Sequence, residues 1–135
     1  ASNAEAAGGT IGAAFRTLNI SVGQVLNSGY CRTIEYARLA FGKAEASELL
    51  LHPKYVPVPG APIPPSYEKR AEAVKKLLAT PPAAGTNTIL LTHGLVVRDA
   101  AGFEMAAAEA AIFRPDGRGG TTLVARVLPD GWVAK

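Results

Sequence analysis

The fold of this chain is decided by one stretch, Thr88-Ile89-Leu90-Leu91-Thr92-His93-Gly94. Its first five residues are β-branched or apolar at both odd and even positions, which is typical of a parallel strand covered on both faces. We therefore expect a central strand here. His93 and Gly94 follow at once, so an imidazole and a permissive backbone lie at the carboxyl end of that strand, where parallel sheets bind their ligands.

On the N-terminal side of this stretch, helices alternate with a strand. Apolar residues at helical spacing predict helices at Glu5–Leu18 and Thr33–Phe41, with Gly42 as the C-terminal cap of the second. Between them, Ser21–Ser28 is a short apolar run among turn formers, which predicts a buried strand ending near Asn27. The N-terminal part of the chain therefore contains a strand, turn and helix unit.

The middle of the chain is divided by prolines. Leu49–Leu51 is compatible with a further short strand, whereas Pro53–Pro65 contains six prolines and predicts an irregular surface excursion. Ser66 is then expected to cap a helix that ends before Pro81, because Ala71, Val74, Leu77 and Leu78 form an apolar stripe.

An antiparallel hairpin is predicted towards the C-terminus, where Ala110–Arg114 and Thr121–Val127 flank a glycine-rich loop. Strands that alternate with helices and then give way to a hairpin predict an α/β fold. We expect a three-layer α/β/α domain with a mostly parallel sheet and an antiparallel C-terminal hairpin. The length of 135 residues suits a single domain, residues 1–135, with one core.

Composition excludes several classes of function. The net charge is +3, and the basic residues are scattered from Arg16 to Lys135, so we expect no nucleic-acid partner. One cysteine, Cys31, with His52 and His93, cannot form a zinc-finger set, and we expect no metal and no cofactor. No apolar run reaches about 18 residues, so we expect no membrane span. The opening residues fit an exported protein, a tag or a truncation, and both a cytoplasmic and an exported location stay open.

Polar side chains gather at two predicted strand ends. Residues 27–32 follow the first strand and residues 92–94 follow the central one. Arg32 lies at a strand-to-helix junction, where a guanidinium and the first helical N–H groups favour an anion. His93 is able to donate to a phosphoryl oxygen or to carry a proton, although a structural histidine at a strand end remains an equal alternative.

These blocks resemble a known family. The segments Phe15–Leu18, Val25–Ala37 and Asn87–Gly94, together with Glu109–Pro115, are similar in content and order to the histidine phosphatase superfamily, also called phosphoglycerate mutase-like, in its bacterial phosphatase form. The resemblance implies a phosphomonoester hydrolase in which a histidine of an Arg-His-Gly motif attacks phosphorus and water hydrolyses the phosphohistidine.

The resemblance also implies roles for residues of this chain. Arg32 and His93 match the second arginine and the second histidine, which hold and neutralise the phosphoryl group in the transition state. We expect Ser28 and Gly94, from the two strand-end clusters, to complete the phosphate-binding set. The general acid is a carboxylate of variable position, for which Glu109 and Glu35 are the candidates.

The chain also departs from the family pattern. It contains no Arg-His-Gly, so the nucleophile and the first strand have no counterpart. Gly29 stands where proline is common, and Tyr36 stands where threonine is common. His52 directly precedes Pro53 and is not expected to replace the nucleophile.

Two explanations of this gap remain open. The chain is either part of an ordinary phosphatase whose sheet exposes an apolar edge, or a paralogue without catalysis that keeps an oxyanion-binding or scaffold role. In both cases we expect little turnover, a phosphorylated small molecule or inorganic phosphate as ligand, and a possible homodimer through the sheet edge. A serine hydrolase built from Ser28, His93 and Asp99 is disfavoured, because Ser28 is not in a G-x-S-x-G elbow.

Overall fold

The computed structural model describes residues 3–43, 45–51, 67–106 and 108–132. Two helices and a strand come first: α1 (Asn3–Thr17), β1 (Val22–Asn27) and α2 (Cys31–Phe41). The other elements follow in the order β2 (Glu45–Ala46), η1 (Glu48–Leu50), α3 (Tyr67–Ala79), β3 (Asn87–Leu91), α4 (Gly94–Ala101), β4 (Ala110–Pro115), β5 (Thr121–Val127) and η3 (Pro129–Trp132). The α/β class expected from the sequence is confirmed. The expected proline-rich excursion, the Ser66 cap and His52 lie outside the described residues.

The parallel sheet has three strands in the order β2-β1-β3. The ends of β1 and β3 are in register, with Leu26 beside Leu90 and Asn27 beside Leu91. The expectation that Thr88–Thr92 forms a central strand is therefore wrong among the described residues, because β1 holds the centre and β3 pairs on one side only. Apolar residues at both odd and even positions indicate that both faces of a strand are covered by apolar groups. They do not indicate which strands are its neighbours in the sheet.

The short strand expected at Leu49–Leu51 is also wrong. Leu49 and Leu50 belong to the 3-10 helix η1. The strand next to β1 is the two-residue β2, in which Glu45 pairs with Leu26 of β1. A backbone hydrogen bond from Ser47 N–H to Asn27 O, at 2.7 Å, continues this contact and then turns the chain away. Leu50 and Leu51 are nevertheless buried, so their apolar side chains serve the core rather than a ladder.

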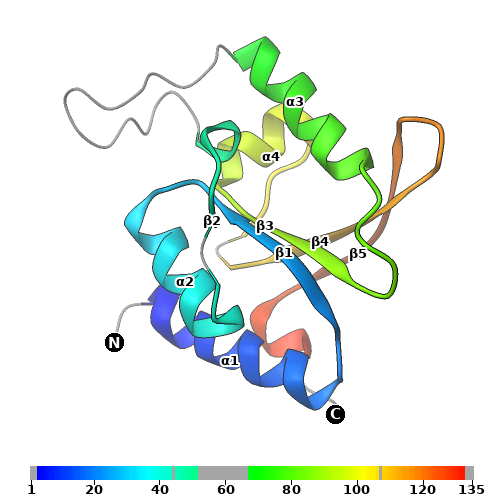
Figure 1. Ribbon diagram of the computed structural model, residues 1–135. Helices are drawn as coiled ribbons and strands as arrows, with labels where there is room; N and C mark the ends of the chain where they lie inside the picture. The colour runs from blue at the N-terminus through cyan, green and yellow to red at the C-terminus, as the bar shows by residue number, and fades with distance from the viewer. Residues whose placement is uncertain (1–2, 44, 52–66, 107, 133–135) are drawn as a thin grey trace.

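Helices lie on both faces of the parallel sheet, with α1 and α2 on one side and α3 and α4 on the other (Figure 1). The core beneath α3 and α4 consists of Leu26 of β1 with Leu50, Val74, Val96 and Ala100, and Leu77, Leu78 and Leu90 pack against it. The apolar stripe predicted for α3 is thus directed inward. This layer holds the start of α4, and therefore His93, against the end of β1.

The opposite layer is built on a close approach of α1 to α2. A Cβ added at Gly12 would lie 2.6 Å from the carbonyl oxygen of Ala40, so only glycine fits this crossing without movement. Phe15 of α1 packs edge-on against Phe41, with centroids 5.2 Å apart, and against Trp132 at 4.9 Å. The C-terminal end of α2 is therefore anchored on α1, whereas the short turn of residues 28–30 keeps its N-terminus next to the end of β1.

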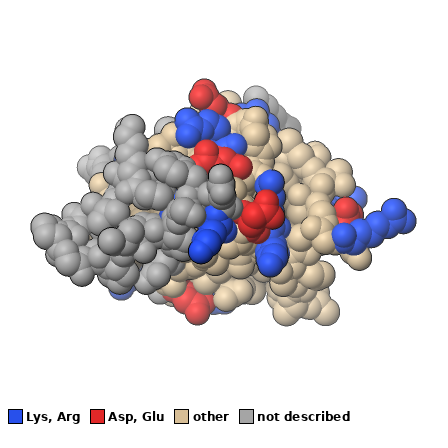
Figure 2. All heavy atoms as spheres, turned by 90° about the horizontal axis from the view of Figure 1, so that it is seen from above, with Lys and Arg blue, Asp and Glu red and all other residues tan. Residues whose placement is uncertain are grey.

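The C-terminal hairpin is antiparallel as expected, with Ala110 opposite Val127 and Pro115 opposite Thr121. It forms a two-stranded sheet of its own among the described residues, and does not extend the parallel sheet. Phe103 stacks on Phe113 at a centroid distance of 6.3 Å, which joins the hairpin to the segment after α4. Basic and acidic side chains are interspersed on the face seen in Figure 2. No helix in the described part of the chain has the length and apolar character to cross a membrane.

Candidate functional site

The structure brings the two strand-end clusters into direct contact. Ser28 Oγ lies 2.8 Å from His93 Nε2, although the two residues are 65 positions apart in the sequence. This contact follows from the sheet, because β1 and β3 are parallel neighbours whose last residues, Asn27 and Leu91, are paired. The residues that follow each strand therefore leave the same edge of the sheet side by side.

A short chain of hydroxyl groups continues from this contact into α2. Ser28 Oγ is 3.0 Å from Thr33 Oγ1, and Thr33 Oγ1 donates to Tyr30 O at 2.8 Å. The backbone N–H of Tyr30 donates to Ser28 Oγ at 3.3 Å. Ser28 and Thr33 are both buried, so these hydrogen bonds are made away from bulk water.

Each of the two strands, β1 and β3, is followed by a helix after a short turn. Tyr30 is the N-cap residue of α2, and His93 is the N-cap residue of α4; both have extended backbone angles and no side-chain capping hydrogen bond. The N-terminus of a helix carries a partial positive charge and N–H groups that have no partner within the helix. Two such termini therefore begin at the same edge of the sheet, next to Ser28 and His93.

Arg32 joins this group through an aromatic ring. Its guanidinium lies 5.6 Å from the centroid of the Tyr30 ring, and the same ring meets the His93 imidazole edge to face at 5.5 Å. The arginine side chain is exposed while Ser28 is 3% exposed, so the site runs from a solvated cation down to a buried hydroxyl. Arg32, His93, Ser28 and Gly94 thus belong to one region, as the strand-end pattern predicted.

The turn between β1 and α2 explains one departure from the family pattern. Gly29 has a φ of +81°, in the left-handed region, and its N–H donates to Asn27 Oδ1 at 2.8 Å. Proline, which restricts φ to about −65° and has no N–H, cannot adopt this turn. Asn27 is 1% exposed, and its Nδ2 has no hydrogen-bond partner among the described residues.

Sequence reasoning placed Asn27 and Tyr30 in the strand-end cluster without assigning these roles, and it left Thr33 out of the site. Asn27 holds the turn, Thr33 extends the hydroxyl chain, and Tyr30 bridges Arg32 and His93. The spacing did contain one signal, because a threonine three residues after an N-cap position is placed to bond back to the N-cap carbonyl.

Glu109 is held elsewhere. Its carboxylate accepts hydrogen bonds from Arg126 Nε at 2.7 Å, from Arg126 Nη2 at 3.0 Å and from the backbone N–H of Ala106 at 2.8 Å. The hydrogen bond from Arg126 lowers the pKa of Glu109, and the bond from the Ala106 N–H acts in the same direction. A general acid needs a raised pKa, so these contacts fit a structural ion pair in the hairpin. Glu35, the other candidate, is a half-buried residue of α2.

Tyr36 and Cys31 are the other reactive side chains of α2. Burial raises the pKa of Tyr36 to about 12, so its phenol is neutral at physiological pH. It therefore contributes packing and a polar hydroxyl, but no charge. The Cys31 thiol is free and exposed at the first helical residue. Asp99, the acid of the disfavoured serine-hydrolase triad, pairs with its neighbour Arg98 at 3.3 Å.

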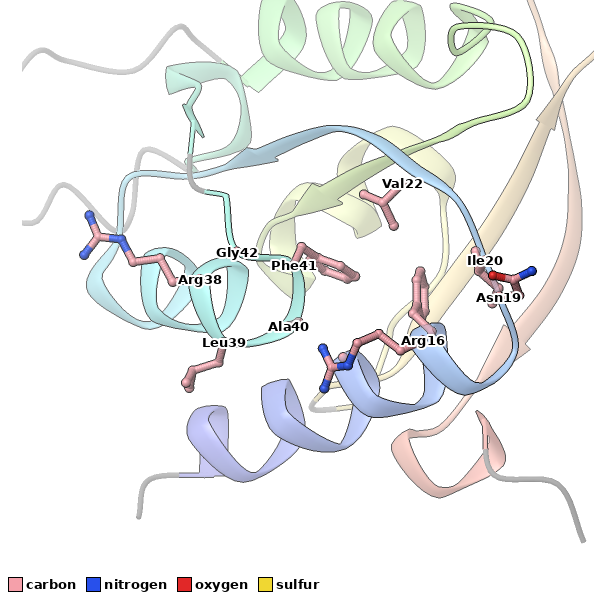
Figure 3. A pocket seen from close by; sticks show the side chains of 11 residues that line it. Arg16, Asn19, Ile20, Val22, Arg38, Leu39, Ala40, Phe41 and Gly42 are labelled. Atoms are coloured by element: carbon pink, nitrogen blue, oxygen red, sulfur yellow. The ribbon is translucent and has the colours of Figure 1, made fainter.

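Two hollows accompany these residues. A small one of about 220 Å³ begins at Gly94, directly beside His93, and is also lined by Leu95, Arg98, Glu104 and Met105. A larger one of about 580 Å³ lies between the C-terminal parts of α1 and α2. Figure 3 shows Phe41 directed into the larger hollow and Arg38 directed away from it. This larger hollow contains no histidine, serine or carboxylate in its lining, so size alone does not identify the reactive region.

Comparisons with known proteins do not add to this geometry. No family model, no curated protein and no solved structure matches the chain.

Proposed function

We propose that this region binds a phosphoryl group or a similar oxyanion, and that the chain is a histidine phosphatase-like, phosphoglycerate mutase-like domain. In a catalytically complete form such a domain hydrolyses phosphomonoesters through a phosphohistidine. The observation that carries the proposal is the 2.8 Å contact between Ser28 Oγ and His93 Nε2. It unites the two segments that resemble the family, and both precede a helix N-terminus at one sheet edge.

Each group has a defined part in holding an anion. The Arg32 guanidinium offers paired N–H donors that match phosphate oxygens in a bidentate geometry. Gly94 opens α4, where backbone N–H groups and the helix dipole favour negative charge, and it has no Cβ to obstruct a close approach. His93 contributes a second cation when protonated. These groups would neutralise the charge on a transferring phosphoryl group.

The chain holds part of the catalytic machinery of the proposed reaction. It has no Arg-His-Gly motif to supply the attacking histidine, and its ion pair keeps Glu109 from serving as a proton donor. We therefore expect this polypeptide to bind an oxyanion with little or no turnover. The alternative function, a non-catalytic oxyanion-binding or scaffold domain, uses the same residues and differs only in whether a complete enzyme exists.

The binding proposal is tested by titrating inorganic phosphate into the ¹⁵N-labelled protein near pH 6. Shifts should concentrate on the backbone N–H groups of residues 28–33 and 93–96. Arg32→Ala and His93→Ala should each weaken binding roughly 10- to 100-fold, the value of a hydrogen bond that involves a charged group. Arg38→Ala removes an exposed arginine from the other end of the same helix and should leave binding unchanged.

Hydrolysis of an aryl phosphate by the same four proteins between pH 4 and 8 distinguishes the two forms of the proposal. Binding without turnover is the expected result. Turnover that both substitutions abolish would mean that a residue of this chain, such as His93 itself, accepts the phosphoryl group. Phosphate that neither binds nor shifts the two helix starts would overturn the proposed function.

A further inference from the structure

Counting the hydroxyl protons gives the chain that ends on His93 a preferred direction. A carbonyl oxygen accepts and never donates, so the proton between Thr33 Oγ1 and Tyr30 O, 2.8 Å apart, belongs to Thr33. Tyr30 O also accepts the backbone N–H groups of Thr33 at 2.9 Å and of Ile34 at 3.1 Å. If the hydroxyl proton of Thr33 pointed elsewhere, its oxygen would still face Tyr30 O at 2.8 Å with no proton between them. The single hydroxyl proton of Thr33 is therefore committed, and towards Ser28 the threonine oxygen acts only as an acceptor.

The same counting of hydroxyl protons applies to Ser28. Ser28 Oγ and Thr33 Oγ1 lie 3.0 Å apart, so the proton between them comes from Ser28. The only proton of the Ser28 hydroxyl is then directed to Thr33 Oγ1. The serine oxygen accepts the Tyr30 N–H at 3.3 Å and has one further acceptor position, which faces His93 Nε2 at 2.8 Å.

We propose that Thr33 is a positioning residue that fixes the tautomer of His93: through Ser28 it makes Nε2 the protonated nitrogen and leaves the lone pair of the neutral imidazole on Nδ1. Ser28 then serves the imidazole as an acceptor and has no proton left for a phosphoryl oxygen. It is also unsuited to act as a nucleophile with His93 as base, since a base must accept the serine proton.

The consequence for ligand binding rests on the proposed function. Because the Nε2 proton is directed to Ser28, the neutral imidazole has no ring proton to offer an oxyanion, and only the imidazolium carries a second one. The tautomer itself is a property of the protein without any ligand, and it can be measured whether or not the protein binds phosphate.

The test is a long-range ¹H–¹⁵N correlation spectrum of the histidine side chains at about pH 8.5, well above the ordinary histidine pKa of about 6.5. Protonated and unprotonated ring nitrogens have widely separated ¹⁵N shifts, so the tautomer is read directly. The chain has only two histidines, and His52→Gln assigns the signals of His93. The expected result is the Nε2–H tautomer of His93 in the unmodified protein.

Variants test the role of Thr33. Thr33→Val removes the acceptor, which frees the Ser28 proton to turn towards Nε2, so the Nδ1–H tautomer should increase; Thr33→Ser should restore the original state. Thr86→Val is the matched control, since Thr86 Oγ1 donates to the carbonyl three residues earlier, at 2.7 Å, in the same way. It should leave the His93 signals unchanged.

Two results would overturn the inference: an Nδ1–H tautomer in the unmodified protein, or a Thr33→Val protein whose His93 signals match those of Thr86→Val. If Thr33→Val does not fold, the tautomer of His93 in the unmodified protein still decides the direction of the hydroxyl chain. A protein with the Nε2–H tautomer that does not bind phosphate would contradict the proposed function alone.

Discussion

At the scale of single residues, neighbouring groups decide what a charged side chain can do. Arg32 is exposed and rests on the Tyr30 ring, so its guanidinium remains able to receive an anion. Arg126 has donors of the same kind, but they are taken by Glu109 and by the carbonyl of Glu104 at 2.6 Å. The two arginines therefore have different functions, which their positions in the sequence, at a strand-to-helix junction and within a hairpin strand, already suggested.

The Glu109–Arg126 pair predicts a defined response to acid. Arg126 lowers the pKa of Glu109 below its ordinary 4.5, so the folded state favours the carboxylate. The ion pair therefore contributes its full stabilisation of the folded state above about pH 4.5. This contribution is lost as the pH falls through the lower pKa that Glu109 has in the folded state. Unfolding by urea should therefore show Glu109→Gln to be less stable than the unmodified protein between pH 5 and 8, by a difference that narrows below pH 4.5.

Glu72→Gln is the control for this titration. Glu72 pairs with Lys75 at 3.7 Å, and the two side chains are 72% and 53% exposed, so the pair should contribute little at any pH. A difference for Glu109→Gln that stays constant down to pH 3 would contradict the assigned role of the ion pair.

At the scale of secondary-structure elements, one glycine sets the distance between α1 and α2. Gly12→Ala places a methyl group 2.6 Å from the backbone oxygen of Ala40, which cannot move without shifting α2. We expect a loss of about 1–3 kcal/mol in unfolding free energy, the usual cost of overpacking. Because α2 also carries Arg32 at its start, phosphate affinity should fall as well.

Gly9→Ala gives the matched comparison within the same helix. Its Cβ would meet nothing within 4 Å, so the substitution should stabilise the protein by roughly 0.5–1 kcal/mol through helix propensity. Chemical denaturation of both variants checks the pair. Equal effects of the two substitutions would mean that the α1–α2 approach does not depend on Gly12.

At the scale of the whole molecule, the sheet edges are the feature that bears on association between copies of the chain. Among the described residues β3 pairs only with β1, and the hairpin forms a separate sheet. An unpaired edge is a template for another strand. We therefore predict that the chain forms a homodimer through β3, detectable as twice the chain mass by light scattering after size exclusion.

Thr88→Lys on β3 should convert the dimer to a monomer, because a lysine on an edge strand opposes pairing. Thr122→Lys makes the same change on β5, where the residue is exposed, and should leave the dimer intact. A protein that is monomeric at all concentrations, or a dimer dissociated only by Thr122→Lys, would contradict pairing through β3.

Local patterns in the sequence determined the α/β class, the approximate extents of α1, α2 and α3, the Gly42 cap with its φ of +70°, and the hairpin, whereas α4 was not predicted. These depend on side-chain periodicity and on glycine and proline, which act over a few residues. Strand order did not follow, because apolar residues on both faces say nothing about which neighbour supplies the hydrogen bonds. In the part of the chain that the structure describes, β3 lies at the edge of the sheet and not at its centre. The nearness of Arg32, Ser28 and His93 was foreseen from strand ends, whereas the link through Thr33 and Tyr30 and the capture of Glu109 by Arg126 were decided by tertiary structure. Such contacts depend on distances of a few ångström between side chains far apart in the chain, which no local pattern encodes.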